Sequence, residues 1–132
     1  MIGLDTNILV RYLTQDHKRQ CDLVNAFIES SANESKKLIV NLMVLLELVW
    51  VLEDCYHYKK SEITQTLRSI SEVDVLEIEG RETLLEALHD FQKHAVDLSD
   101  CLIGRFNQMN KCSHTVTFDK QACKLETFQS LQ

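Results

Sequence analysis

Four acidic residues of this 132-residue chain, Asp5, Glu47, Asp100 and Asp119, stand where carboxylates could do chemistry. Asp5 and Asp119 each end a short apolar or β-branched run that is typical of a buried strand. In open α/β sheets, ligands bind beyond the carboxyl ends of the strands, so both positions suit a site. A helix cap or a turn would also explain either aspartate, and for a lone strand-end aspartate that structural role is the more common one.

Glu47 lies within the most apolar segment of the chain, which predicts a central helix. Its neighbours at helical spacing are all apolar: Met43, Val44, Trp50 and Val51. An ionised carboxylate in such surroundings is costly unless a cation or a metal ion accompanies it. Metal binding is one interpretation of Glu47, and a salt bridge or a position at the rim of the helix is the other.

Asp97 and Asp100 are three residues apart on one expected helix and therefore share a face. The helix dipole favours carboxylates in the first turn, which is a sufficient structural reason for Asp97. Asp100 begins the apolar run Cys101-Leu102-Ile103, so we expect it close to the core. Asp100 is therefore the stronger candidate of the two.

Carboxylates that converge repel one another, and hard oxygen ligands of this kind select Mg²⁺ or Mn²⁺. Such a site suits phosphodiester hydrolysis, because the metal activates the attacking water and neutralises charge on the phosphate. The chain has 14 basic and 20 acidic residues and a formal net charge of −6, which is the wrong sign for binding nucleic acid. Metal ions bound by clustered acids would reverse that charge locally.

The pattern of apolar residues predicts strands that alternate with helices, and hence a three-layer α/β sandwich with a short, mostly parallel sheet. We expect strands over residues 1–4, 38–40, 73–78 and 115–118, and helices over residues 6–13, 18–31, 42–56, 61–70, 81–94, 97–109 and 120–125. No linker or repeat divides the chain, so residues 1–132 are expected to form a single domain. No signal peptide or membrane span is expected, and the five scattered cysteines fit reduced thiols in the cytoplasm.

Four segments, in order, resemble those of PIN-domain ribonucleases, and especially of VapC-type toxins from toxin–antitoxin pairs. They are MIGLDTNILVRYLTQD at residues 1–16, LLELVWVLE at residues 45–53, DLSDCLIG at residues 97–104 and TVTFDKQA at residues 115–122. None is specific alone, but together they span essentially the whole chain. The departures are small: Cys101 and Gly104 stand where family members often carry alanine.

The resemblance implies a short parallel sheet wrapped by helices, and cleavage of RNA with Mg²⁺ or Mn²⁺. By this resemblance Asp5, Glu47 and Asp100 would hold a metal ion, and Asp119 would complete the acidic cluster. Polar residues beside these acids would orient them: Thr6, Asn7, Asp97 and Thr117. It also implies a cognate antitoxin protein and a homodimer, with transfer RNA among the candidate substrates. The cations that flank the acidic segments could contact RNA or simply be solvated: Arg11, Lys18, Arg19, Lys120 and Lys124.

Two other functions are compatible with parts of the pattern. A phosphatase with an aspartyl nucleophile would also carry an early aspartate, but such enzymes usually have a second acid two residues on, where this chain has Asn7. A non-catalytic PIN-like module could use the acidic cluster to dock a basic partner. Binding without catalysis would survive the substitution Asp5→Asn, whereas hydrolysis would not.

Overall fold

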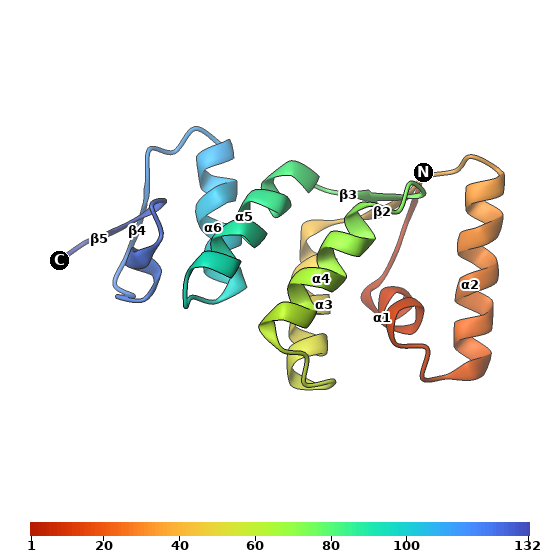
Figure 1. The fold of residues 1–132 in the computed structure, drawn as a ribbon. Helices are drawn as coiled ribbons and strands as arrows, with labels where there is room; N and C mark the ends of the chain where they lie inside the picture. The colour runs from red at the N-terminus through yellow and green to blue at the C-terminus, as the bar shows by residue number, and fades with distance from the viewer. The chain divides into compact units, whose positions relative to one another are not determined.

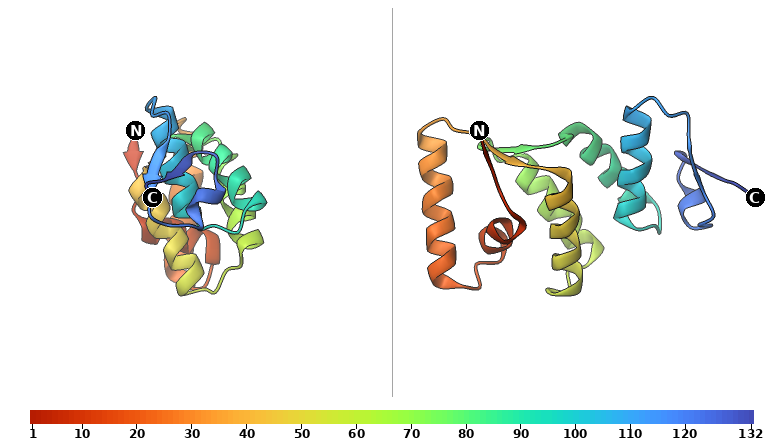
Figure 2. Two further views of the ribbon diagram at one scale, coloured as in Figure 1. Left: turned by 90° about the vertical axis from the view of Figure 1, so that its left-hand side faces the viewer. Right: turned by 180° about the vertical axis from the view of Figure 1, so that it is seen from behind.

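The computed structural model describes residues 1–132 as two compact units, Met1–Glu79 and Gly80–Gln132, which are treated separately below (Figures 1 and 2). Helices alternate with short strands along the chain, and a parallel sheet is flanked by helices. The predicted α/β class is therefore confirmed. No helix combines the length and the hydropathy that crossing a membrane would require.

The first unit contains a three-stranded parallel sheet in the order β1-β2-β3. Each pair of neighbouring strands is joined by two helices, as parallel strands require a crossover connection. Along the chain the elements are β1(Ile2–Gly3), α1(Thr6–Thr14), α2(Lys18–Asn33), β2(Leu38–Val40), α3(Leu42–Asp54), α4(Lys60–Ser71) and β3(Leu76–Ile78). Helix α1 packs against both α2 and α3, and α3 packs against α4 (Figure 1).

The core of the first unit consists of aliphatic side chains from the sheet and from one face of each helix. The fully buried members include Leu9, Leu38, Val40, Leu45, Leu48, Leu52, Ile63 and Leu67. Polar residues set the starts of the helices: Asn41 Oδ1 accepts the Val44 N–H at 2.9 Å, and Glu62 Oε1 accepts the Lys59 N–H at 2.9 Å. The last cap differs from the sequence-based expectation, which placed the start of that helix at Ser61.

Helix α3 is not central, contrary to the expectation from its composition. Its buried face carries Leu45, Leu48, Val49 and Leu52, while Met43 is 75% and Trp50 60% exposed. The helix is apolar all round, but the sheet and the neighbouring helices cover only one of its faces. Glu47 lies on the uncovered side and is exposed. Its carboxylate is therefore solvated, and the argument from burial in an apolar environment is wrong.

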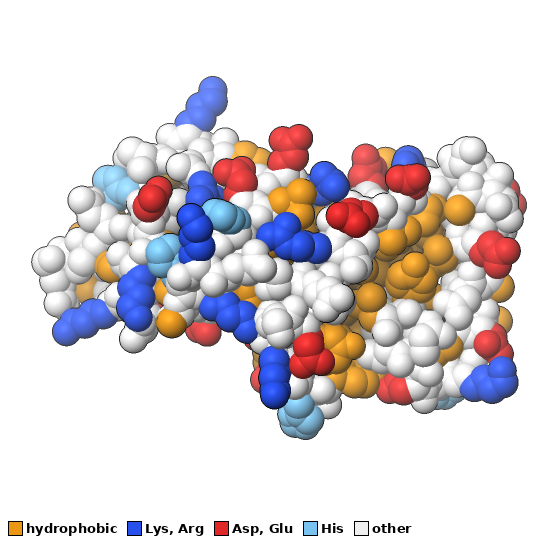
Figure 3. All heavy atoms as spheres, in the orientation of Figure 1, with side chains coloured by type: hydrophobic (Ala, Val, Ile, Leu, Met, Phe, Trp, Pro, Cys, Tyr) orange, Lys and Arg blue, Asp and Glu red, His pale blue; other side chains and the backbone are white.

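A hydrophobic hollow of about 380 Å³ lies between β1, the start of α1 and α2. It is lined by Ile2, Gly3, Leu4, Ile8, Leu23, Val24 and Phe27, and it forms part of the orange area on the right-hand side of Figure 3. Leu23 is 61% and Phe27 39% exposed. Strand β1 is also the edge of its three-stranded sheet, so this apolar surface has an unpaired strand edge beside it.

The second unit pairs two helices with a two-stranded parallel sheet. Its elements are α5(Arg81–Lys93), α6(Leu98–Met109), β4(Thr115–Thr117), the 3₁₀ helix η1(Ala122–Lys124) and β5(Phe128–Ser130). The expected last helix over residues 120–125 is thus a single 3₁₀ turn. Strand β5 was not expected from the sequence; it pairs with β4 in the register Thr115↔Phe128.

Candidate functional site

In the first unit, Asp5 and Glu47 line the same cavity, which has a volume of about 390 Å³. Thr6, Asn7 and Arg11 line it with them, as do Val10, Val51, Cys55 and Tyr56. Asp5 reaches the cavity from the end of β1 and Glu47 from the middle of α3. Four of the sequence-predicted residues, Asp5, Thr6, Asn7 and Glu47, therefore share one cavity.

Asp5 caps helix α1. Its Oδ1 accepts the Thr6 N–H at 2.7 Å, and its backbone is extended with φ −85° and ψ 161°. A helix cap is one of the two structural roles that the sequence offered for this aspartate. Capping occupies one carboxylate oxygen and fixes the orientation of the side chain. Asp5 therefore has a structural role that leaves Oδ2 for a ligand.

Thr6 carries a buried hydroxyl without a hydrogen-bond partner. The residue is 6% exposed, and its Oγ1 is one of the few buried side-chain oxygens that make no hydrogen bond. Most buried polar atoms in proteins are satisfied, so an unsatisfied one beside a cavity calls for an explanation. The Thr64 and Thr127 hydroxyls, which lie outside this cavity, are unsatisfied in the same way, so the feature is not specific to the cavity.

In the second unit, Asp97, Asp100 and Asp119 interact electrostatically. Asp97 is the residue before α6, Asp100 lies in the first turn of α6, and Asp119 follows β4. Burial raises the pKa of the Asp100 carboxyl above its usual value, and the negative charges of Asp119 and then Asp97 raise it further. The repulsion among acids that the sequence suggested is therefore present in this unit.

A tight turn after β4 holds Asp119 in place. Thr117 Oγ1 accepts the Asp119 N–H at 2.9 Å, and Asp119 Oδ1 accepts the Gln121 N–H at 2.8 Å. Thr117 thus forms a strand-end hydrogen bond with the backbone of Asp119, and its role in orienting the carboxylate stays a prediction. As at Asp5, Oδ1 of the Asp119 carboxylate accepts a backbone N–H, which leaves Oδ2 for a ligand.

The acids of both units are hard oxygen donors of the kind that Mg²⁺ and Mn²⁺ prefer. The raised pKa of Asp100 shows that its surroundings disfavour the charged form, which a nearby cation would relieve. No three His, Cys, Asp or Glu side chains gather closely enough to hold a metal ion between them. Mg²⁺ typically takes few protein carboxylates and completes its shell with water and phosphate, so the donors fit that ion.

The electrostatics of Asp100 predict a stability change in metal-free protein. Because the pKa of Asp100 is raised on folding, ionisation of this group destabilises the folded state as pH rises through that pKa. Asp100→Asn should therefore raise the melting temperature in EDTA by a few degrees at neutral pH. The difference from the parent should vanish in acid, where Asp100 is protonated in both the folded and the unfolded chain.

Thermal unfolding in EDTA at a series of pH values measures this effect. The matched control is Asp22→Asn, which removes an exposed aspartate that pairs with Lys18 on the surface of α2. That substitution should change the melting temperature little, because exposed ion pairs contribute little stability. A destabilised Asp100→Asn at neutral pH would contradict the repulsion described here.

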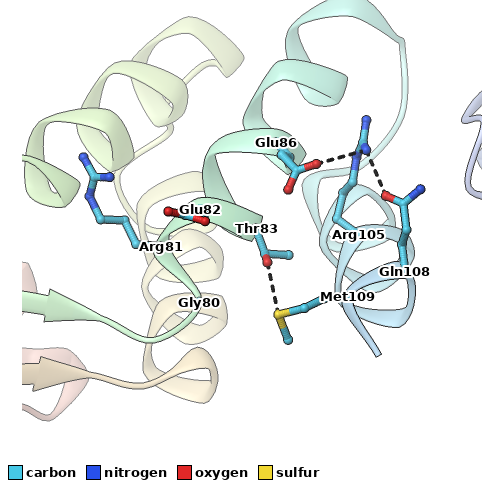
Figure 4. A pocket seen from close by; sticks show the side chains of 8 residues that line it. All are labelled: Gly80, Arg81, Glu82, Thr83, Glu86, Arg105, Gln108 and Met109. Atoms are coloured by element: carbon cyan, nitrogen blue, oxygen red, sulfur yellow. Dashed lines mark hydrogen bonds and ion pairs between the residues drawn. The ribbon is translucent and has the colours of Figure 1, made fainter. Parts of the chain in front are cut away.

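A second cavity, of about 580 Å³, lies against α5 and α6, and two of its charged residues, Glu86 and Arg105, are paired with each other (Figure 4). Arg105 donates to Asp90 from Nε at 2.7 Å and from Nη2 at 2.9 Å, and Nη1 donates to Glu86 and Gln108. The hydrogen bond to Asp90 raises the pKa of the Arg105 guanidinium further. Arg105 therefore joins the two helices and is not available for a ligand.

Sequence reasoning missed two residues that belong to the Asp5 cavity or support it. Tyr56 lines the cavity, and its hydroxyl donates to Asp16 Oδ2 at 2.7 Å. The two residues are 40 positions apart, and neither has a spacing that points to the other. Arg11 was noted only as a flanking cation, and it too lines the cavity.

Comparison with known proteins identifies the class to which this arrangement belongs. The PIN domain family matches residues 2–127, which is nearly the whole chain, and the chain therefore belongs to that family. A similar protein is the VapC ribonuclease of Aquifex aeolicus (strain VF5), which is 25% identical over 122 residues. The alignment covers 92% of this chain and 90% of the relative.

Proposed function

We propose that the chain is a Mg²⁺- or Mn²⁺-dependent endoribonuclease whose catalytic residues are Asp5, Glu47, Asp100 and Asp119. The observation that carries the proposal is that the chain belongs to the PIN domain family and has an acid at all four positions that its resemblance to PIN-domain ribonucleases implies. The name of the VapC ribonuclease relative supports RNA as the substrate. Residues 1–132 would act as a single nuclease domain.

In this proposal Asp5, Glu47 and Asp100 would hold the metal ion, and Asp119 would complete the acidic set directly or through water. The bound metal would lower the pKa of the attacking water and neutralise charge on the phosphate. The Thr6 N–H holds Asp5 at Oδ1, and the Gln121 N–H holds Asp119 at Oδ1, so both present Oδ2 in a fixed direction. Asn7, Asp97 and Thr117 would orient the acids or their ligands.

The same family supports a proposed biological setting. The chain would be the cytoplasmic toxin of a type II toxin–antitoxin pair, inhibited by a cognate antitoxin, with transfer RNA among its candidate substrates. We also propose a homodimer. The apolar hollow beside β1 and the exposed Met43 and Trp50 on α3 supply hydrophobic surface of the kind that protein partners cover.

The alternative function is a non-catalytic PIN-like module whose acids dock a basic partner. The net charge of −6 favours a basic partner over nucleic acid when no metal is bound. This alternative predicts no RNA cleavage under any metal condition. Binding to its partner would persist in EDTA and after Asp5→Asn.

Incubation of total cellular RNA with the purified protein, free of any antitoxin, tests the proposal. We expect discrete cuts with Mg²⁺ or Mn²⁺ and none with EDTA, because chelation removes the metal. Sequencing of the product ends would identify the substrate and the cleaved bond. Intact RNA in every metal condition, together with binding to a basic protein partner, would favour the docking module instead.

A further inference from the structure

Asp16 holds two side chains that line the Asp5 cavity, although Asp16 itself does not line it. Its Oδ1 accepts a hydrogen bond from Arg11 Nη1 at 3.0 Å, and its Oδ2 accepts one from the Tyr56 hydroxyl at 2.7 Å. Arg11 Nε donates to Gln20 Oε1 at 2.6 Å. Asp16 and Gln20, which do not line the cavity, thus hold the side chains of Arg11 and Tyr56, which do.

We propose that Arg11 and Tyr56, positioned by Asp16, form a subsite that binds the RNA strand beside the candidate catalytic acids. Arg11 contacts a backbone phosphate, and the Tyr56 ring packs against a neighbouring ribose or base. This inference rests on the proposed function, since it assigns residues of the same cavity to the substrate.

Arg11 is the one cationic residue among those lining this cavity, which also contains Asp5 and Glu47. Two of its guanidinium nitrogens, Nε and Nη1, are used by Gln20 and Asp16, and Nη2 is the third. A guanidinium whose direction is fixed in this way loses little further entropy when it binds a phosphate. Its side chain is 28% exposed, so part of it remains accessible.

Tyr56 is half-buried and follows the end of α3, so its ring forms one wall of the cavity. Nucleic-acid bases stack on aromatic rings with little dependence on sequence. The hydrogen bond from Tyr56 lowers the pKa of Asp16 most, ahead of the bond from Thr14 and the charge of Arg11. Asp16 therefore remains ionised and continues to hold both side chains.

Thr6 is a further polar residue of this cavity, and its hydroxyl is buried. Thr6 lines the same cavity as Arg11 and Tyr56, and its Oγ1 has no hydrogen-bond partner. A role for Arg11 limited to joining α1 to α2 would explain its bond to Gln20 on α2. It would not explain why the same carboxylate that holds Arg11 also holds Tyr56, which follows α3.

Binding of a fluorescently labelled single-stranded RNA, measured by anisotropy in EDTA over a series of salt concentrations, tests the Arg11 contact without cleavage. Arg11→Gln should weaken binding by about tenfold, as expected for the loss of one charge-assisted hydrogen bond. It should also reduce the slope of log K against log salt by about 0.7, the value for one phosphate contact on a single strand. The control is Lys36→Gln, which removes one positive charge from an exposed residue that pairs with Glu34 outside this cavity and should leave the slope unchanged.

Two further variants separate positioning from folding. Asp16→Asn should raise KM for RNA cleavage severalfold with kcat nearly unchanged, because it releases Arg11 and Tyr56 without altering the acids. Tyr56→Phe, which keeps the ring, should bind RNA more tightly than Tyr56→Ala. A purely structural role of these residues would lower the melting temperature of each variant and leave the salt slope and KM at parental values.

Alkylation of cysteines gives a readout in the cavity itself. Cys55 lines the cavity and is exposed, and Cys112 is an exposed cysteine of the other unit that serves as the reference. RNA should protect Cys55 in the parent, and this protection should weaken in Arg11→Gln or, if that variant does not fold, in Asp16→Asn. Equal protection of Cys55 in parent and variants would overturn the subsite.

The outcomes distinguish failure of the subsite from failure of the proposed function. If the parent cleaves RNA and Arg11→Gln keeps the parental slope and KM, the subsite is wrong and the nuclease assignment stands. If the parent binds RNA with an Arg11-dependent salt slope but does not cleave it whichever metal ion is added, the subsite stands and the nuclease assignment is wrong.

Discussion

The rate of RNA cleavage should fall by about 100-fold or more in each of four variants: Asp5→Asn, Glu47→Gln, Asp100→Asn and Asp119→Asn. Loss of a single group that stabilises charge in the transition state typically lowers the rate of an enzyme by this factor. Each substitution removes a negative charge that would hold the metal ion and keeps the size of the side chain. The measurement is the initial rate of cleavage of a mapped RNA substrate at saturating Mg²⁺ or Mn²⁺.

The amide substitutions preserve the local structure at the two aspartates that follow strands. Asparagine Oδ1 can still accept the Thr6 N–H at position 5 and the Gln121 N–H at position 119, which are the bonds that Asp5 and Asp119 make. The folds of these variants should therefore remain intact in circular dichroism. A loss of activity would then report on the carboxylate charge and not on the helix cap or the turn.

Two control substitutions test whether the loss of activity is specific to the four acids. Asp97→Asn should lower the rate less than the other four, because Asp97 is the weaker candidate of the acidic set. Asp22→Asn, on the surface of α2, should cleave at the parental rate. Parental activity in Asp5→Asn with metal bound would show that the site lies elsewhere, and the four acids would then retain only their capping and surface roles.

The sequence predicted the α/β class because the short strands are apolar and the helices repeat their apolar residues at the right spacing. The helix caps were less predictable. Asp5, Thr6 and Asn7 can all cap a helix, and which residue does so depends on where β1 ends. Strand β5 carries no strong β-branched signal in Phe128-Gln129-Ser130, and it exists through its pairing with β4.

Contacts between distant residues account for what the sequence did not reveal about the candidate site. Glu47 has only apolar helical neighbours, yet it is exposed because the face of α3 that carries Met43 and Trp50 is uncovered. The link from Tyr56 to Asp16 joins the ends of two different helical segments. No periodicity along the chain encodes such a contact, whereas the repulsion of Asp97 and Asp100 follows from their spacing on one helix.

Gly104→Ala should destabilise the second unit, although a glycine-to-alanine change inside a helix normally stabilises it by about 0.5–1 kcal/mol. Gly104 lies within α6 and is buried. A Cβ at this position would overlap Thr127 Oγ1, and it would come within 2.9 Å of Thr127 Cβ and 3.0 Å of the Phe128 ring. Overpacking of this kind typically costs about 1–3 kcal/mol. The sign of the effect is therefore reversed, and thermal unfolding should show a melting temperature several degrees below that of the parent.

The obstructing residue, Thr127, has little room to move. It is 6% exposed, and its carbonyl accepts the Thr115 N–H at 2.8 Å at the start of the β4–β5 pairing. A displacement of Thr127 would disturb strand β4, which leads to Thr117 and Asp119. We therefore expect Gly104→Ala to lower cleavage activity as well as stability, even though Gly104 has no side chain that could take part in catalysis.

Replacement of the obstructing side chain should partly reverse the effect. Thr127 Oγ1 is buried without a hydrogen-bond partner, so Thr127→Ala removes the overlapping oxygen and breaks no hydrogen bond. The double variant should be more stable than Gly104→Ala alone, with a coupling energy of about 0.5–3 kcal/mol that is characteristic of residues in contact. The matched control is Gly3→Ala, where the new Cβ would lie 3.8 Å from the Ile39 side chain in ordinary contact. If Gly104→Ala were as stable as the parent and showed no coupling to Thr127, α6 and the segment that enters β5 would not be packed as closely as described. Steric exclusion by Thr127 would then not account for a glycine at position 104.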